Sequence, residues 1–149
     1  MAGQERLDEV LGMLRASGGR VTSPRRAILE ALIAHSGHPT AEQLTAEVQA
    51  RQPEVHESTV YRFLEELERL GVVDHVHLGH GPAVYHFADD SHHHLVCEQC
   101  GLVVEVPDKT LDALRRRLRA DHGFEVGPRH FAVLGRCKGC AGDTAAAAG

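Results

Sequence analysis

Two Cys-x-x-Cys motifs constrain this chain more than any other feature. They are Cys97/Cys100 and Cys137/Cys140, and the chain has no other cysteine. Two thiolates from one tight turn can bind a single ion, and zinc favours four thiolates in a tetrahedron. The sequence therefore predicts a structural Zn²⁺ site that ties the C-terminal segment back to the first pair and stabilises the fold without taking part in chemistry.

A redox dithiol is the alternative for these motifs. It would require a thiol of low pKa, and the sequence predicts no cysteine at the N-terminus of a helix. With 149 residues, of which 42% are hydrophobic, the chain is long enough for one domain or two small ones. It has neither an apolar stretch approaching ~18 residues nor a secretory signal, so we expect a cytoplasmic protein that does not bind membranes. The formal net charge of −5 argues weakly against a nucleic-acid ligand, but a whole-chain sum hides local clustering.

The first 70 residues have apolar side chains at helical spacing. We expect a helix to begin at Ser23-Pro24, with the serine as its N-cap, and a second helix to begin with a capping box at Thr40-Ala41-Glu42-Gln43. A third helix, residues 58–70, has one apolar face and leaves Tyr61 and Arg62 outside that face.

Short strand patterns follow Gly71, at Val72–Leu78 and Ala83–Phe87. Three helices followed by such a hairpin are typical of a winged helix-turn-helix. From His92 on, the pattern predicts a small α/β unit with strands Leu95–Cys97, Leu102–Val106 and Phe131–Leu134 and a helix Lys109–His122. The predicted fold class is α+β, with a winged helix-turn-helix domain in residues 1–88, an α/β dimerisation domain with the zinc site in 89–140, and a disordered tail in 141–149.

Several motifs in one order resemble the ferric uptake regulator family of metal-dependent bacterial repressors. They are Arg20-Val21-Thr22 with Arg25, Ser58-Thr59-Val60-Tyr61-Arg62, His92-His93-His94-Leu95-Val96-Cys97 with Cys100-Gly101, His122-Gly123-Phe124, His130, and Cys137-x-x-Cys140. The resemblance implies a homodimer that binds a double-stranded, pseudo-palindromic, A/T-rich DNA operator when metal is bound, and so represses metal uptake and homeostasis genes.

Within this resemblance, the DNA-binding residues follow from their positions. Tyr61 and Arg62, on the exposed side of the third helix, can contact thymine methyl groups, guanine or phosphate. Arg20 resembles the family arginine that enters the minor groove. Phosphate contacts are expected from Arg15, Arg25 and Arg26. The alternative for all six is a solvated polar surface.

A regulatory metal site at the hinge between the two domains is the second implication. Its expected ligands are His38, His86, His92, His94 and Glu105. In an extended segment His92 and His94 share one face, and His93 points to the other. Because this set contains no cysteine, it argues against a thiolate-containing zinc sensor and for Ni²⁺ or Fe²⁺, with Mn²⁺ and a histidine-only Zn²⁺ site as further candidates.

A second histidine site is expected at the wing. The stretch from Asp74 to Gly81 contains His75-Val76-His77 and resembles the nickel-responsive branch of the family. The expected ligands of this second metal site are His75, His77 and His130, with His93 and Asp112 as additional candidates. Isolated strand histidines at the protein surface are the alternative.

The competing classes have weaker support. A zinc hydrolase would need a motif such as His-Glu-x-x-His, and His56-Glu57-Ser58-Thr59-Val60 lacks the second histidine. We therefore expect no enzyme. An iron-based peroxide sensor of the same family remains open, because it would use the same hinge ligands. A metal-storage protein remains a further alternative, and it would not bind DNA.

Overall fold

The structure, a computed structural model, describes residues 2–90, 92–127 and 132–147, and for residues 143–147 it describes the backbone alone. The chain divides into two compact units. Unit 1 comprises Met1–His75 and Ala83–Asp89, and unit 2 comprises Val76–Pro82 and Asp90–Gly149. Each unit is described by itself below.

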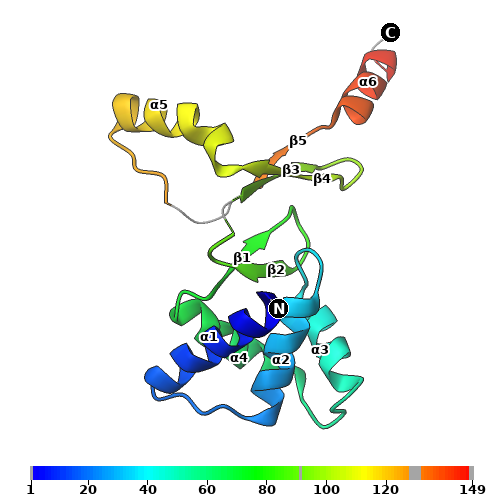
Figure 1. Ribbon diagram of the computed structural model, residues 1–149. Helices are drawn as coiled ribbons and strands as arrows, with labels where there is room; N and C mark the ends of the chain where they lie inside the picture. The colour runs from blue at the N-terminus through cyan, green and yellow to red at the C-terminus, as the bar shows by residue number, and fades with distance from the viewer. Residues whose placement is uncertain (1, 91, 128–131, 148–149) are drawn as a thin grey trace. The chain divides into compact units, whose positions relative to one another are not determined.

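Unit 1 is built on a helical bundle (Figure 1). Its helices are α1 (Ala2–Ala16), α2 (Ser23–Ala34), α3 (Ala41–Gln49) and α4 (Glu57–Arg69). The N-cap of α2 is Thr22 rather than Ser23, and its hydroxyl accepts a hydrogen bond from the Arg25 amide at 3.4 Å. The predicted capping box at α3 is confirmed, because Thr40 and Gln43 each bond the other's backbone amide.

The apolar stripe of α4 anchors the bundle. Its buried residues are Val60, Phe63, Leu64 and Leu67, spaced so that they share one helix face. Phe63 and Leu64 are at most 1% exposed, so truncating either to alanine should cost about 3–5 kcal/mol. This burial fixes the rotation of α4 and keeps Tyr61, which is 40% exposed, on the solvent side.

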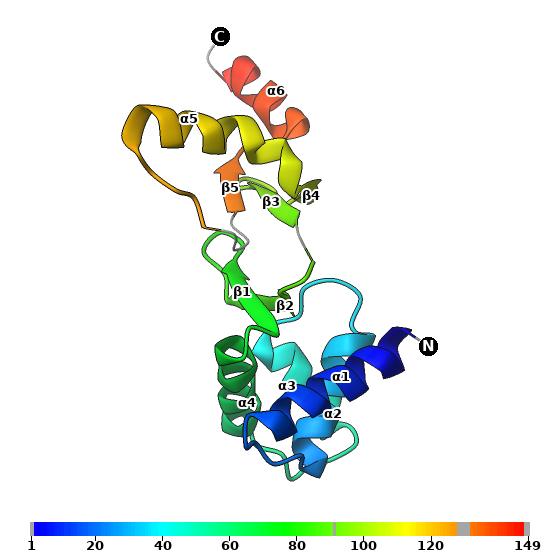
Figure 2. The ribbon, with the colours of Figure 1, turned by 60° about the vertical axis from the view of Figure 1, so that its left-hand side comes forward.

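A two-stranded sheet follows α4. Gly71, at φ +71°, adopts the left-handed conformation that ends the helix. Strands β1 (Val73–His77) and β2 (Ala83–Phe87) then pair with each other, and both views show them at one end of the bundle (Figure 2). The predicted winged helix-turn-helix arrangement of helices and hairpin is therefore confirmed.

Unit 2 contains a three-stranded sheet. Its elements are β3 (His92–Cys97), β4 (Val103–Pro107), the 3-10 helix η1 (Asp108–Leu111), α5 (Asp112–His122), β5 (Ala132–Gly135) and α6 (Lys138–Ala147). The strand order is β4-β3-β5, with β4 antiparallel and β5 parallel to β3. The predicted α+β class is confirmed.

Two details of unit 2 differ from the sequence-based expectation. Strand β3 begins at His92 instead of Leu95, because the histidine run pairs with β4 in continuous register. In the segment expected to be a disordered tail, the structure has helix α6 as far as Ala147. Alanine has the highest helix propensity, which favours a helix in this segment. The start of the last predicted strand, Phe131, lies outside the described residues.

None of the described helices combines the length and the apolar character needed to cross a membrane.

Candidate metal centres and nucleic-acid interface

The first cysteine pair is presented by a tight turn between β3 and β4. Gly101, at φ +76°, allows the chain to reverse directly after Cys100, and its amide donates to the Cys97 carbonyl at 2.9 Å. The second pair follows β5: Cys137 directly precedes α6, and Cys140 lies in its first turn. Because β5 pairs in parallel with β3, with Cys97 opposite Gly135, both pairs lie at the same end of the sheet.

The four sulfur atoms converge. All four Sγ atoms lie within 4.8 Å of one another, in Cys97, Cys100, Cys137 and Cys140. The Sγ atoms of Cys100 and Cys137 are 3.8 Å apart. In a tetrahedral site with Zn–S bonds of about 2.3 Å, neighbouring sulfurs are about 3.8 Å apart. The donor set and its spacing therefore fit a structural zinc ion.

The protonation behaviour of the thiols supports the same conclusion. Backbone hydrogen bonds from Cys137 and Cys100 lower the pKa of Cys97 to about 6. Thiol hydrogen bonds with Cys137 and Cys100 raise the pKa of Cys140 to about 12. The charged form of Cys140 is therefore disfavoured beside the other sulfurs, and a bound dication would remove that penalty.

The expectation that no cysteine lies at a helix N-terminus is wrong. Cys137 directly precedes α6, which begins at Lys138. The cause is the unexpected helix in the alanine-rich segment. Convergence of four sulfurs, rather than two, nonetheless favours a metal site over a redox dithiol.

His92 and His94 lie on one face of β3, as predicted. Their ring centroids are 4.8 Å apart. Glu105 of β4 is opposite His94 in the sheet register, and its Oε1 is 3.9 Å from His92 Nε2. Within unit 2 these three residues can each direct one ligand atom to a common point. They offer two nitrogens and one oxygen to a divalent ion.

Unit 1 has its own pair of imidazoles. The segment before α3 pairs with β2, through a bridge between Thr40 and Val84 and a 2.8 Å hydrogen bond from the Tyr85 amide to the Pro39 carbonyl. This pairing brings His38 next to His86, with ring centroids 5.3 Å apart and the rings nearly perpendicular. Two nitrogen ligands of the expected set are therefore neighbours in unit 1.

The expected second site is not assembled by the described residues. His75 and His77 are both exposed on β1. His75 Nδ1 pairs with the carboxylate of Glu68, and His77 Nδ1 is 3.4 Å from the Gly81 carbonyl. Within the described ranges no group of three metal ligands forms around this pair. The third expected ligand, His130, lies outside them.

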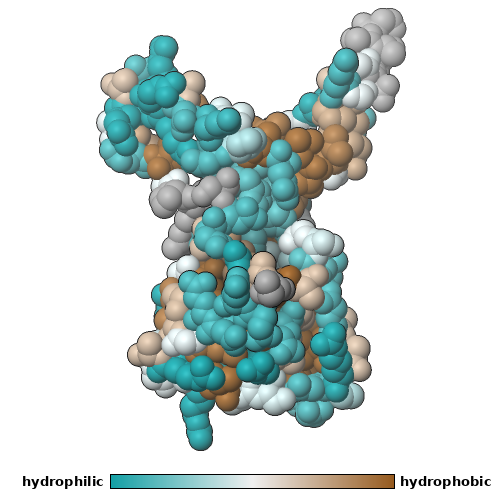
Figure 3. All heavy atoms as spheres, viewed as in Figure 1, coloured by the Kyte–Doolittle hydropathy of each residue, from teal (hydrophilic) through white to brown (hydrophobic). Residues whose placement is uncertain are grey.

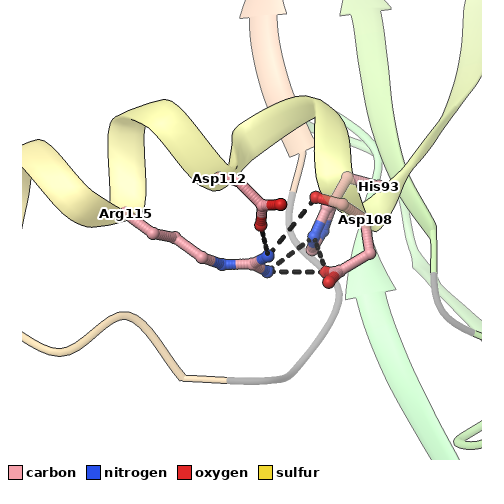
Figure 4. Close-up of polar contacts among 4 residues, drawn as sticks. All are labelled: His93, Asp108, Asp112 and Arg115. Carbon is pink, nitrogen blue, oxygen red and sulfur yellow. Dashed lines mark hydrogen bonds and ion pairs between the residues drawn. The ribbon is translucent and has the colours of Figure 1, made fainter.

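His93 and Asp112, the additional candidates for the second site, share an arginine neighbour. Their common neighbour is the guanidinium of Arg115, which also contacts Asp108 (Figure 4). Hydrogen bonds from Arg115 and His93 lower the pKa of Asp108, and Asp108 in turn raises the pKa of Arg115. A fixed cation thus lies beside the two residues expected to bind a metal cation. Asp108 and Arg115 were not anticipated, although seven residues, two helical turns, separate them in sequence.

Most of the side chains that were expected to bind DNA are exposed on unit 1. Tyr61 and Arg62 are exposed on α4, and Arg15 and Arg20 are exposed at α1 and at the loop before α2. Arg26 is exposed as well and lies 3.6 Å from Glu30. No described carboxylate pairs with Arg15, Arg20 or Arg62, so these three remain available for an anionic ligand.

Arg25 differs from this group. Its guanidinium forms a two-point ion pair with the Glu66 carboxylate, at 2.5 and 3.3 Å, and donates to the Arg20 carbonyl at 3.0 Å. It also lies over the Phe63 ring. Arg25, which was expected to contact phosphate, thus has internal partners that join α2 to α4 and to the loop before α2. Sequence reasoning missed Glu66 because 41 positions separate the partners.

A family profile and individual known proteins match most of this chain. The profile of the ferric uptake regulator family matches residues 16–132. The peroxide-responsive repressor PerR of Staphylococcus aureus strain USA300 is 30% identical over 137 residues, which cover 92% of this chain and 93% of the relative.

Two solved structures are similar over most of their length. The ferric uptake regulator from Pseudomonas aeruginosa with manganese is 32% identical, with a TM-score of 0.67 over 84% of this chain and 95% of that chain. The Helicobacter pylori ferric uptake regulator has a TM-score of 0.76 over 93% of each chain at 18% identity, a likeness of fold. With a family profile that spans most of its residues and a 30% identical relative matched almost end to end, this chain belongs to the ferric uptake regulator family.

Proposed function

We propose that the chain is a metal-dependent, DNA-binding transcriptional repressor that acts as a homodimer and controls metal uptake and homeostasis genes. The observation that carries this proposal is the division of the metal ligands between the units. His38 and His86 are neighbours in unit 1, and His92, His94 and Glu105 are neighbours in unit 2. Neither set alone completes the coordination shell of a divalent transition ion.

The mechanism follows from linkage. An ion that takes ligands from both sets binds most tightly when the units adopt one mutual arrangement, and it shifts the population towards that arrangement. If this arrangement in the dimer matches two half-sites of a pseudo-palindromic operator, metal tightens DNA binding, and DNA must tighten metal binding by the same factor. Repression would then follow intracellular metal supply.

The DNA contacts proposed for unit 1 use exposed arginines and the exposed Tyr61. Arg62 and Tyr61 of α4 would enter the major groove, and Arg20 would enter an A/T-rich minor groove. Arg15 and Arg26 would bind phosphates. Arg25 would hold Arg20 and α4 in place instead of touching DNA, in line with its ion pair with Glu66.

The proposed dimer interface is the sheet of unit 2. Six large apolar side chains of this unit's sheet region are between 38% and 49% exposed: Leu95, Leu102, Val103, Val104, Val133 and Leu134. Some of them line a hollow of about 420 Å³, and apolar residues gather over this part of unit 2 (Figure 3). An exposed apolar surface of this kind is typical of an interface, and a second copy of the chain is the occupant that a twofold operator requires.

The proposed regulatory ion is Ni²⁺ or Fe²⁺, with Mn²⁺ and Zn²⁺ as alternatives. Imidazole nitrogens with one carboxylate and no sulfur suit all four ions, so ligand chemistry alone does not select among them. The test is fluorescence-anisotropy binding of chelator-treated protein that retains its structural zinc to a palindromic duplex, titrated with each ion at fixed salt. One ion should tighten binding at lower concentration than the others. An affinity for the duplex that none of the four ions changes would contradict the proposal.

If the regulatory ion is Ni²⁺, a second metal site is expected at the hairpin formed by β1 and β2. It assigns His75, His77 and His130 to a second site, and the exposure of His75 and His77 on β1 is compatible with it. In that version, His75→Ala should abolish nickel-induced DNA binding and leave zinc content and dimerisation intact. His35→Ala, at a histidine paired with Glu47, is the matched control. Loss of the dimer in His75→Ala would contradict the assignment.

A peroxide-sensing repressor is the second candidate, favoured by the 30% identity to a peroxide-responsive relative. In this version Fe²⁺ bound at the same ligands would lead to oxidation of a ligand histidine and release of DNA. Mass spectrometry should then find oxidised His38 or His92 after peroxide treatment of iron-loaded protein. The manganese-loaded protein should stay unmodified, and equal modification in both would exclude this version.

A further inference from the structure

The side of β3 that faces η1 and α5 has a charged cluster of its own. We call His93, Asp108, Asp112 and Arg115 the Arg115 cluster (Figure 4). Arg115 Nη2 lies 2.7 Å from Asp108 Oδ1, and Nη1 lies 3.6 Å from Asp112 Oδ1. His93 Nε2 lies 2.8 Å from the same Asp108 oxygen and 2.9 Å from Arg115 Nη2. One guanidinium thus contacts an imidazole and two carboxylates.

The three partners of Arg115 are typical ligands of a divalent metal ion. Imidazole nitrogen with two carboxylate oxygens suits manganese, iron, nickel or zinc. In this chain, however, a cation already lies among them. Arginine stays protonated at any pH that the fold tolerates, so its charge is permanent. Its planar fork also fixes the direction of each hydrogen bond.

The cluster is partly shielded from solvent, with the Asp108 and Asp112 side chains 44% and 48% exposed. His93 is 1% exposed, and the Arg115 side chain is 21% exposed. Solvent therefore screens the guanidinium only in part. A metal ion bound to the same oxygens would have to displace the hydrogen bonds of Arg115 to Asp108 and remain within a few ångströms of a positive charge.

We propose that Arg115 is the resident cation of this cluster, and that it excludes a divalent metal ion from a set of ligands that would otherwise bind one. The inference goes beyond the proposed function, and it holds whether or not the chain binds DNA. It assigns position 115 as a determinant of how many metal ions each chain holds.

The test counts bound metal. Zinc-retaining protein is dialysed to equilibrium against Mn²⁺, and the metal content per chain is measured by elemental analysis. Arg115→Met removes the charge and keeps most of the side-chain volume. Arg117→Met is the matched control, because Arg117 lies on the same helix, is 79% exposed and pairs with Asp121. We expect Arg115→Met to bind one more Mn²⁺ per chain than wild type, and Arg117→Met to equal wild type.

Two further variants tie the result to the cluster. His93→Ala combined with Arg115→Met should return to the wild-type count. Asp112→Asn alone should leave the wild-type count unchanged, and this arm decides the question even if Arg115→Met does not fold. A folded Arg115→Met protein without an additional ion, or a wild-type count that falls in Asp112→Asn, would overturn the proposal.

Discussion

The ion pair between Arg25 and Glu66 predicts that Arg25 stabilises the fold, in contrast to the arginines proposed to bind DNA. Arg25 resembles a phosphate ligand in sequence, but its guanidinium is committed to Glu66 and to the Arg20 carbonyl. Arg62 on α4 has no described carboxylate partner. Replacing each arginine by methionine should therefore change different properties of the protein.

The size of the effect follows from the geometry. The side chains of Arg25 and Glu66 are 27% and 18% exposed, so the pair is neither fully solvated nor fully buried. Exposed ion pairs contribute about 0–1 kcal/mol, and hydrogen bonds to charged groups about 1.5–3 kcal/mol. Arg25→Met leaves Glu66 without its partner. We therefore expect it to lower the free energy of unfolding of unit 1 by about 2 kcal/mol. At about 4–8 °C per kcal/mol for a domain of this size, the melting temperature should fall by about 8–16 °C.

The assay is thermal unfolding followed by far-UV circular dichroism, because the chain has no tryptophan. Arg62→Met should stay within about 0.5 kcal/mol of wild type and should weaken operator binding by about 1–3 kcal/mol. A double-mutant cycle of Arg25→Met with Glu66→Gln isolates the pair. Equal melting temperatures for Arg25→Met and Arg62→Met, or additive effects in the cycle, would refute the reasoning.

Three other substitutions test the remaining sites. Cys137→Ser should abolish zinc binding and unfold unit 2, because structural zinc contributes about 10–16 kcal/mol in small zinc domains. Elemental analysis measures the zinc content, and circular dichroism measures folding. A folded, zinc-loaded variant would contradict this prediction. Leu134→Glu should yield monomers in sedimentation analysis, whereas Leu114→Glu on α5 should remain dimeric, and two dimeric variants would refute the interface. Glu105→Gln should weaken the regulatory metal at least about tenfold in calorimetry at unchanged zinc content, and unchanged affinity would exclude Glu105 as a ligand.

The elements that sequence predicted correctly are those set by local patterns. The spacing of Val60, Phe63, Leu64 and Leu67 specifies both the helix and its buried face, so the exposure of Tyr61 followed without tertiary information. The capping box at Thr40 depends only on residues within one helical turn. Likewise, the alternation of side chains along a strand was sufficient to separate His92 and His94 from His93.

The contacts that the sequence analysis did not anticipate join residues that are distant in sequence. Arg25 and Glu66 lie on different helices, and nothing local distinguishes Arg25 from the exposed Arg26. His93 belongs to a histidine run that suggests metal ligands, and only the fold brings Arg115 to it. In each case a charged side chain found an internal partner that sequence periodicity does not reveal.

Calorimetric metal titration with and without operator duplex tests whether metal and operator DNA bind cooperatively. DNA should tighten the binding of the regulatory metal by the same factor by which metal tightens DNA binding, about 5–150-fold for typical coupling energies. His94→Ala should reduce that factor towards one, and the zinc content should stay unchanged. Identical metal affinity in the presence and absence of DNA would exclude coupling between the metal site and the DNA-binding surface.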